Sequence, residues 1–266
     1  MKYNIIITLL ILFIAIPFQA CDDEEYLTDV KIRSIDANDQ WKSIEDLEVL
    51  VNGAYWHTSG EVWNDSQLDH GRAARILQTD IAKYVQNAGN TWEFSSSVVQ
   101  DYYNRVNINP ENSANQKIWE GCYKSIASAN EALDFIENNP RFNDPNNWYP
   151  RIIGELHFIR AFNYFLMAKI FAPAYDPSGA NDADAFPLRT IPTEGLGDAN
   201  MAPATVQQAY DLIISDLETA VQNLPDGFES ASNPPESYAD GRADKYAAAF
   251  LLARVYFQTG QWGEAV

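Results

Sequence analysis

The sequence has few of the residues that bind metals or form disulfide frameworks. It contains two cysteines, three histidines and three methionines in 266 residues. The histidines, His57, His70 and His157, are widely separated and fit no metal-ligand spacing. It also has no glycine-rich phosphate loop and no nucleophile elbow. We therefore expect no metal, no cofactor and no catalytic residue, and the protein is not expected to be an enzyme.

Basic residues are also scarce. Eighteen lysines and arginines stand against 37 acidic residues, giving a formal charge of −19. Such a surface repels phosphate backbones and anionic headgroups, so nucleic acid is not an expected partner, and direct electrostatic docking onto a membrane is not expected either. Aromatic residues make up 13% of the chain. An acidic, aromatic protein is suited to neutral ligands, although charge alone nominates none.

No apolar run in the sequence is long enough to span a bilayer. The longest, residues 5–18, has 14 residues, whereas spanning takes about 20. This run has the length of a signal-peptide core, and we assign residues 1–20 to a signal peptide. Ala20 then precedes Cys21, and this junction resembles the bacterial lipobox, in which the cysteine is acylated. The alternative is an ordinary signal peptide with Cys21 incidental.

Residues 21–40 are predicted to form an acidic, flexible tether. Asp22-Asp23-Glu24-Glu25 follows the lipidation site at once and resembles the surface-export signal of Bacteroidetes lipoproteins. A solvated tether is a compatible interpretation. Two acyl chains give stable anchoring where one gives marginal binding, so we expect attachment to the membrane through the lipid only. Acylation of Cys21 would leave Cys122 without a disulfide partner, and it is expected to be a buried small hydrophobe.

Apolar residues of the mature chain recur at helical spacing. Ser43 is placed to cap the first helix, and a Thr205/Gln208 capping box to begin a later one. No segment alternates with the period of a strand, so the predicted class is all-α. Pro140, Pro145 and Pro150 are expected to break the chain before a helix that is apolar nearly all round and therefore buried. The predicted helices are 43–55, 72–85, 115–138, 151–171, 205–224 and 242–259.

The C-terminal region has the spacing of a tetratricopeptide repeat. Leu252-Ala253-Arg254-Val255-Tyr256 is followed by Gly260, Trp262 and Ala265 at the expected steps. Small residues let paired helices approach closely, while large ones fill the groove between repeats. Long insertions, 57–115 and 172–204, separate the helices. The predicted architecture is an irregular tetratricopeptide-like helical repeat with long loop insertions.

Five further motifs, in order along residues 40–266, resemble the signatures of the SusD/RagB family. They are Trp119, Tyr123, Ile126 and Ala129-Asn130; Glu155, Arg160-Ala161-Phe162 and Tyr164; Phe186-Pro187-Leu188; Tyr210, Ile213, Asp216-Leu217 and Ala220; and Gly241-Arg242-Ala243 with Leu251-Leu252-Ala253 and Tyr256.

The resemblance implies a glycan- or nutrient-binding lipoprotein on the outer face of the outer membrane. Such proteins resemble lids over a SusC-like TonB-dependent transporter and help load it with oligosaccharide; some relatives handle peptides. Members are about twice this length, so residues 41–266 are expected to form a SusD-like domain truncated at its C-terminus. The last helix would then expose an apolar face.

The loosely patterned segment 56–105 holds the ingredients of a sugar site. Aromatic faces stack on pyranose rings, while Asp, Asn and Arg read hydroxyl groups. Family members place part of their ligand platform in this region. Each aromatic residue taken alone could instead be partly buried in the core. The candidate ligand-binding residues are Trp63, Asp69, Arg72, Asp80, Tyr84, Trp92 and Tyr102.

Other interpretations remain open at this level. Glu155, Arg160 and Arg242 could form a site, although charged residues at helix contacts are more often packing elements. The acidic loop 176–184 could bind calcium, but its spacing departs from an EF-hand and favours a solvated loop. A scaffold that binds peptides or a protein partner is the alternative function. A glycoside hydrolase, which would need a close carboxylate pair, is the third.

Overall fold

A computed structural model describes residues 41–59, 106, 109–193, 200–228 and 241–265. The chain divides into two compact units, residues 1–42 and 43–266, and every described helix belongs to the second. The only β-type pairing among the described residues is an isolated bridge between Asp184 and Thr205. The predicted all-α class is confirmed. The helices are α4 (Ile44–Ser59), α8 (Ser113–Asn138), α9 (Trp148–Phe171), α10 (Val206–Asn223) and α11 (Lys245–Thr259).

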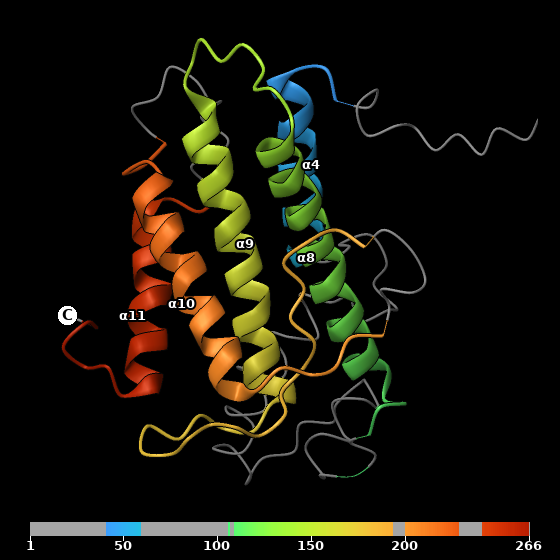
Figure 1. Ribbon diagram of the computed structural model, residues 1–266, viewed down its shortest axis with the longest axis vertical. Coiled ribbons are helices and arrows are strands. Elements are labelled where there is room, and N and C mark those ends of the chain that lie inside the picture. Colours follow the sequence, from blue (N-terminus) through green and yellow to red (C-terminus); the bar gives the residue numbers. More distant parts are fainter. Residues whose placement is uncertain (1–40, 60–105, 107–108, 194–199, 229–240, 266) are drawn as a thin grey trace, which may run out of the picture. The chain divides into compact units, whose positions relative to one another are not determined.

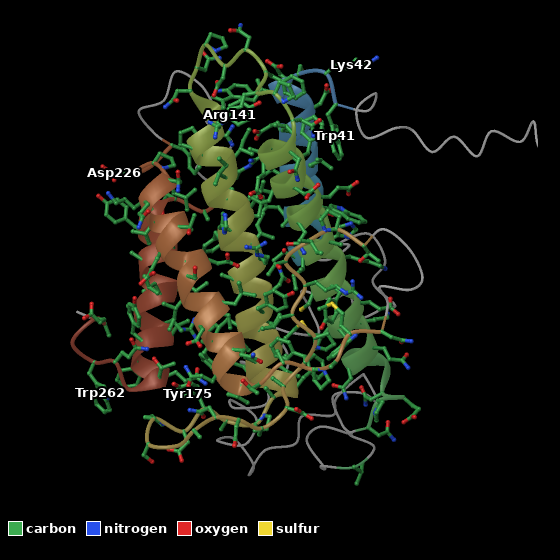
Figure 2. All side chains as sticks on the ribbon, viewed as in Figure 1. Trp41, Lys42, Arg141, Tyr175, Asp226 and Trp262 are labelled. Carbon is green, nitrogen blue, oxygen red and sulfur yellow. The ribbon has the colours of Figure 1, made fainter. Side chains whose placement is uncertain are left out.

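Helix α9 is the central element of the second unit. It packs against α4 and α8 on one side and α10 on the other, and α11 packs on α10 (Figure 1). Because α9 has neighbours on several sides, a helix that is apolar nearly all round is stable there, as its sequence predicts. Side chains of α8, α9 and α10 fill the space between these helices (Figure 2). Fully buried members of this core include Ile118, Ile126, Tyr164, Met167, Ile213 and Leu217.

The start of α9 corrects one prediction. Pro150 was expected to precede the helix, but it occupies the third helical position. A proline is tolerated there because first-turn N–H groups have no intrahelical acceptor. The Asp144 carboxylate accepts hydrogen bonds from the backbone N–H groups of Trp148 and Tyr149 at 2.8 and 2.9 Å. Asp144 thus caps a helix that the proline does not interrupt.

The other helix ends follow their capping residues. Thr205 and Gln208 form the predicted capping box at the start of α10. Helix α11 begins at Lys245, three residues later than predicted, because Asp244 caps it by accepting from Ala247 N at 2.7 Å. Helix α4 continues to Ser59, four residues beyond the prediction. The predicted helix 72–85 lies outside the described residues.

The loop after α9 is fastened to the helices by tyrosines. Tyr123 Oη donates to the carbonyl of Pro187 at 2.7 Å, and Tyr164 Oη donates to the carbonyl of Arg189 at 2.8 Å. The buried Phe186 ring stacks on Tyr164, with ring centroids 5.8 Å apart. These residues belong to three of the family-like motifs, so the motifs specify how the loop docks.

Gly154 marks a close approach between α9 and the end of α10. A Cβ built there would lie 2.9 Å from Leu224 Cγ and 3.1 Å from the Leu224 backbone nitrogen. Because Leu224 N is held by Ala220 O, the backbone cannot retreat freely. We expect Gly154→Ala to lower the free energy of unfolding by about 1–3 kcal/mol, measured by urea denaturation.

Gly53 in α4 supplies the matched control. A Cβ added there meets nothing within 4 Å. Gly53→Ala should therefore raise stability by about 0.5–1 kcal/mol, because alanine loses less backbone entropy in a helix. Equal effects of the two substitutions would contradict the close approach at Gly154.

Candidate ligand-binding region

The predicted sugar-binding residues lie in a segment that joins two packed helices. All seven, Trp63, Asp69, Arg72, Asp80, Tyr84, Trp92 and Tyr102, lie outside the described residues and stay predictions. The described residues show the helices that precede and follow this segment, α4 and α8. Thr58 Oγ1, near the end of α4, lies 2.6 Å from Ser125 Oγ in the middle of α8. The chain re-enters α8 at Ser113, about 18 Å along that helix at 1.5 Å per residue.

Trp56 is an exposed aromatic residue that is not among the seven residues predicted from the sequence. Its side chain is 48% exposed, and its ring makes an edge contact with His57 at a centroid distance of 5.2 Å. It lies on α4 outside the buried face formed by Leu47, Val51 and Ala54. The predicted helix ended at residue 55, which assigned Trp56 to a loop. Its position outside the apolar face of the helix is the sequence feature that could have identified Trp56 as an exposed aromatic residue.

Glu155 belongs to a buried cluster of four alternating charges. Arg151 joins Glu155 at 2.6 Å and Glu48 of α4 at 2.7 Å. Arg242, just before α11, joins the same carboxylates at 3.0 and 2.7 Å. Arg242 also lies over the ring of Tyr55, with Cζ 5.4 Å from the centroid. The cluster ties α4, α9 and the start of α11 together, as expected of packing elements.

The carboxylates of this cluster are poorly placed for hydrolysis. Glu155 is fully buried and Glu48 nearly so. Burial raises the pKa of Glu155, while the charges of Arg242 and Arg151 oppose that shift. A glycosidase needs one carboxyl group that donates a proton and another that reaches the sugar or water. Two carboxylates held between arginines away from solvent supply neither.

Arg160 forms a second buried cluster with Asp216 of α10. Its Nε and Nη2 donate to the two carboxylate oxygens at 2.8 and 2.7 Å, a bidentate pair. Its Nη1 donates to Asn130 Oδ1 at 2.9 Å, and His157 Nδ1 lies 2.7 Å from the Asp216 carboxylate. Burial raises the pKa of Asp216, but the hydrogen bonds from Arg160 and His157 outweigh burial, so the pKa lies below its usual range.

Asn130 extends this second cluster to the loop after α9. Its amide nitrogen donates to the carbonyl of Arg189 at 3.0 Å. Arg160, Asp216, Asn130 and Arg189 thus connect α9, α10, α8 and the loop. These contacts are internal to the helical repeat.

The acidic loop 176–184 is organised by its own side chains. Asp176 Oδ1 accepts from the backbone N–H and hydroxyl of Ser178 at 2.9 and 2.7 Å, and these bonds lower the pKa of Asp176. Asn181, at a left-handed φ of 52°, accepts from Asp176 N. Within the described part of the chain, no three His, Cys, Asp or Glu side chains are arranged to hold a metal ion.

The family assignment of this chain rests on a match over most of its length. Residues 39–257 match the protein family described as "Starch-binding associating with outer membrane". The chain belongs to the SusD-like family. Among the helices described, none is long and apolar enough to cross a bilayer.

Relatives in the SusD-like family are longer than this chain. SusD-like protein P2 of Formosa agariphila is 25% identical over 229 residues, which cover 85% of this chain and 38% of the relative. A SusD-like protein of Bacteroides ovatus is 25% identical over 144 residues, 54% of this chain and 22% of the relative. The chain therefore spans about two-fifths or less of these curated relatives.

Solved structures share the helical architecture. A SusD superfamily protein from Bacteroides fragilis is 25% identical, with a TM-score of 0.65, and the match covers 85% of this chain and 48% of that one. A laminarin-binding SusD-like protein is 22% identical, with a TM-score of 0.60, over 85% of this chain and 42% of that one. The predicted tetratricopeptide-like fold is thus confirmed, with its family.

Proposed function

We propose that this protein is a lipid-anchored glycan-binding protein of the bacterial cell surface. The family match over residues 39–257 carries this proposal. The relative that binds laminarin supports a neutral oligosaccharide as the ligand. A chain with a formal charge of −19 and many aromatic residues is suited to such a ligand, because stacking and hydroxyl contacts need no basic surface.

The anchor and the transport partner complete the proposed role. Cys21, directly after the apolar segment, is the proposed acylation site, and the acidic tether 21–40 would hold the domain away from the outer membrane. The proposed partner is a SusC-like TonB-dependent transporter. The protein would capture an oligosaccharide and pass it to that transporter, with no chemical step of its own.

Trp56, near the end of α4, adds a described residue to the proposed glycan contacts. Its side chain is half exposed, and it precedes Trp63 and Trp92 in the sequence. An exposed indole offers a flat apolar face to a sugar ring at low conformational cost. The segment that contains Trp63 and Trp92 begins and ends on packed helices, so contacts from it would rest on a rigid base.

Affinity electrophoresis tests the proposal. The mature chain with Cys21→Ser, which cannot be acylated, would run through gels that contain laminarin, starch or another neutral polysaccharide. We expect one glycan to retard it. Trp63→Ala or Trp92→Ala should abolish the retardation, and Trp56→Ala should weaken binding about tenfold, because stacking on one ring contributes on the order of 1–2 kcal/mol.

Trp262→Ala is the matched control, because Trp262 is equally a surface indole but lies beyond α11. It should leave retardation unchanged. A full-length relative would run beside this chain. Retardation of the relative alone would place the ligand contacts outside this chain. Retardation of neither by any glycan would overturn the glycan ligand and favour a peptide-binding scaffold.

A further inference from the structure

A chain of polar side chains is buried where α4 meets α8 and α9. Ser125 Oγ of α8 donates to the carbonyl of Ala54 at 2.6 Å and lies 2.6 Å from Thr58 Oγ1. Asn163 Nδ2 of α9 donates to Thr58 Oγ1 at 3.1 Å. The side chains of Ser125 and Asn163 are both fully buried. The last turn of α4 is therefore joined to both neighbouring helices by hydrogen bonds.

The donors in this chain have one consistent order. The Ser125 hydroxyl has a single proton, which goes to the Ala54 carbonyl, so Ser125 Oγ accepts from Thr58. Thr58 Oγ1 also lies 3.0 Å from that carbonyl, a longer contact than the one to Ser125. Thr58 in turn accepts from Asn163, whose second amide proton goes to the carbonyl of Ile159 at 2.8 Å. Every side-chain donor is thus used, and each bond strengthens the next.

Asn163 is a costly residue for this buried position. Its Oδ1 has no hydrogen-bond partner among the described residues. A buried acceptor without a donor lowers stability, and leucine, which is similar in size, would fill the position without that cost. Residues that break a local packing rule are expected at functional sites. The benefit of Asn163 therefore lies in the hydrogen bonds that it donates, of which the one to Thr58 reaches another helix.

The anchored residues of α4 lie on either side of Trp56. Ala54 and Thr58 are each two residues away from it, and residues two apart on a helix point about 200° apart. Anchors that face α8 and α9 therefore direct the Trp56 side chain outward, in agreement with its being half exposed. Helix α4 ends at Ser59, and the last turn of a helix frays unless it is held. The polar chain supplies that restraint.

We propose that Ser125 and Asn163 are positioning residues for Trp56. Their hydrogen bonds keep the last turn of α4 formed and hold the indole in the orientation that meets a sugar ring. Neither residue touches the glycan, because both are fully buried. The sugar contact in this inference rests on the proposed glycan function, whereas the restraint on the end of α4 does not. Two separate measurements therefore test the restraint and its use.

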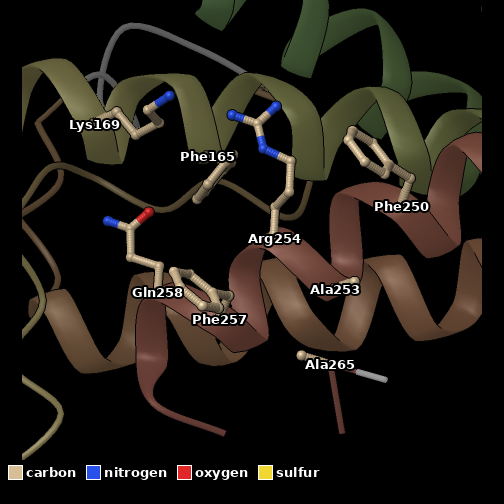
Figure 3. A pocket seen from close by; sticks show the side chains of 8 residues that line it. All are labelled: Phe165, Lys169, Phe250, Ala253, Arg254, Phe257, Gln258 and Ala265. Carbon is tan, nitrogen blue, oxygen red and sulfur yellow. The ribbon is translucent and has the colours of Figure 1, made fainter. Parts of the chain in front are cut away.

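Hydrogen exchange of the backbone amides in the last turn of α4 measures the restraint without a ligand. In the mature Cys21→Ser chain, Ser125→Ala or Asn163→Leu should each speed exchange of these amides about three- to tenfold, because each removes a hydrogen bond between helices. Amides in the first half of α4 should keep their rates. The matched control, Gln258→Ala, removes a 2.7 Å bond to Tyr210 Oη at the groove between α9 and α11 (Figure 3) and should leave α4 unchanged.

Glycan affinity in two backgrounds tests whether the restraint acts through Trp56. In affinity gels that contain laminarin, and in parallel gels that contain starch, Asn163→Leu should weaken binding about three- to tenfold while Trp56 is present. In the Trp56→Ala chain the same substitution should have no further effect, because the residue that it positions is gone. A general loss of stability would weaken binding equally in both backgrounds. Circular dichroism would establish folding, and Thr58→Val, at a half-buried position, removes the hydroxyl more mildly if Asn163→Leu prevents folding.

Two results would overturn the proposal. Unchanged exchange of the last-turn amides in both Ser125→Ala and Asn163→Leu would show that the polar chain does not restrain the end of α4. Equal loss of glycan affinity with and without Trp56 would show that the buried residues act on overall folding instead. If neither polysaccharide retarded the chain but exchange at the end of α4 became faster, the glycan function alone would fail, and the restraint on the turn that carries Trp56 would be confirmed.

Discussion

Replacing Glu155 by glutamine is expected to lower the free energy of unfolding by about 3–5 kcal/mol. The substitution keeps the volume of the side chain but removes one of the two negative charges between Arg151 and Arg242. Glu48 would then face two buried guanidinium groups alone, leaving an uncompensated positive charge. Removing one partner of a buried pair is costly, because the other charge stays desolvated. Urea denaturation at pH 7 measures the loss.

The same substitution on the surface gives the matched control. Glu120 pairs with Lys124 on α8 at 3.6 Å, and both side chains are more than half exposed. Glu120→Gln should change stability by no more than about 0.5 kcal/mol, since water screens such pairs. A loss at Glu155 as small as the loss at Glu120 would show that the buried cluster does not hold α4, α9 and the start of α11 together.

Local sequence signals predicted the helices well where the helix start is encoded nearby. The Thr205/Gln208 box begins α10 as expected, because both partners lie within one turn of the helix end. The start of α11 was less predictable. Arg242 was predicted to be the first residue of this helix, but its side chain pairs with Glu48 and Glu155. Asp244, two residues later, caps the helix instead. Contacts far apart in sequence decide such boundaries.

The sequence identified the charged residues of the family-like motifs but did not predict which residues they pair with. Glu155 and Arg160 stand five residues apart on α9, yet they belong to separate clusters. Glu155 pairs with Arg242, which lies 87 residues away just before α11, and Arg160 pairs with Asp216, which lies 56 residues away on α10. Spacing within one helix identifies a face, whereas the partner on another helix emerges only from packing.

For the candidate binding residues, the sequence indicates the chemistry of a side chain but not whether it is exposed. Composition selected Trp63 and Trp92 of segment 56–105 by their chemistry, and both stay predictions. Trp56 was missed although it lies in a regular helix. Exposure of one indole depends on which neighbouring helix covers it, and α4 packs on α8 and α9 with a different face. Only the assembled helices distinguish a surface aromatic residue from a core one.

Asp216→Asn should destabilise the protein by a similar amount, about 3–5 kcal/mol at pH 7. Asp216 is nearly fully buried, and its two oxygens accept from Arg160 at 2.7 and 2.8 Å. Asparagine keeps the shape but turns an N–H group toward the guanidinium, so Arg160 loses its only carboxylate among the described residues. Asn130 and the loop carbonyls bound to it would lose their anchor as well. Thermal and urea unfolding measure the effect.

The pH dependence separates the charge of Asp216 from its packing. Its folded-state pKa lies below the unfolded value of about 3.9, so its charge stabilises the folded state fully above that value. This stabilisation is lost as the pH falls through the folded-state pKa. The stability difference between the unsubstituted chain and Asp216→Asn should therefore be constant near neutral pH and shrink below about pH 4. Asp211→Asn, on the exposed face of the same helix, should change stability by less than about 0.5 kcal/mol. A difference at Asp216 that persists unchanged into acid would mean that its shape, and not its charge, holds α9 to α10.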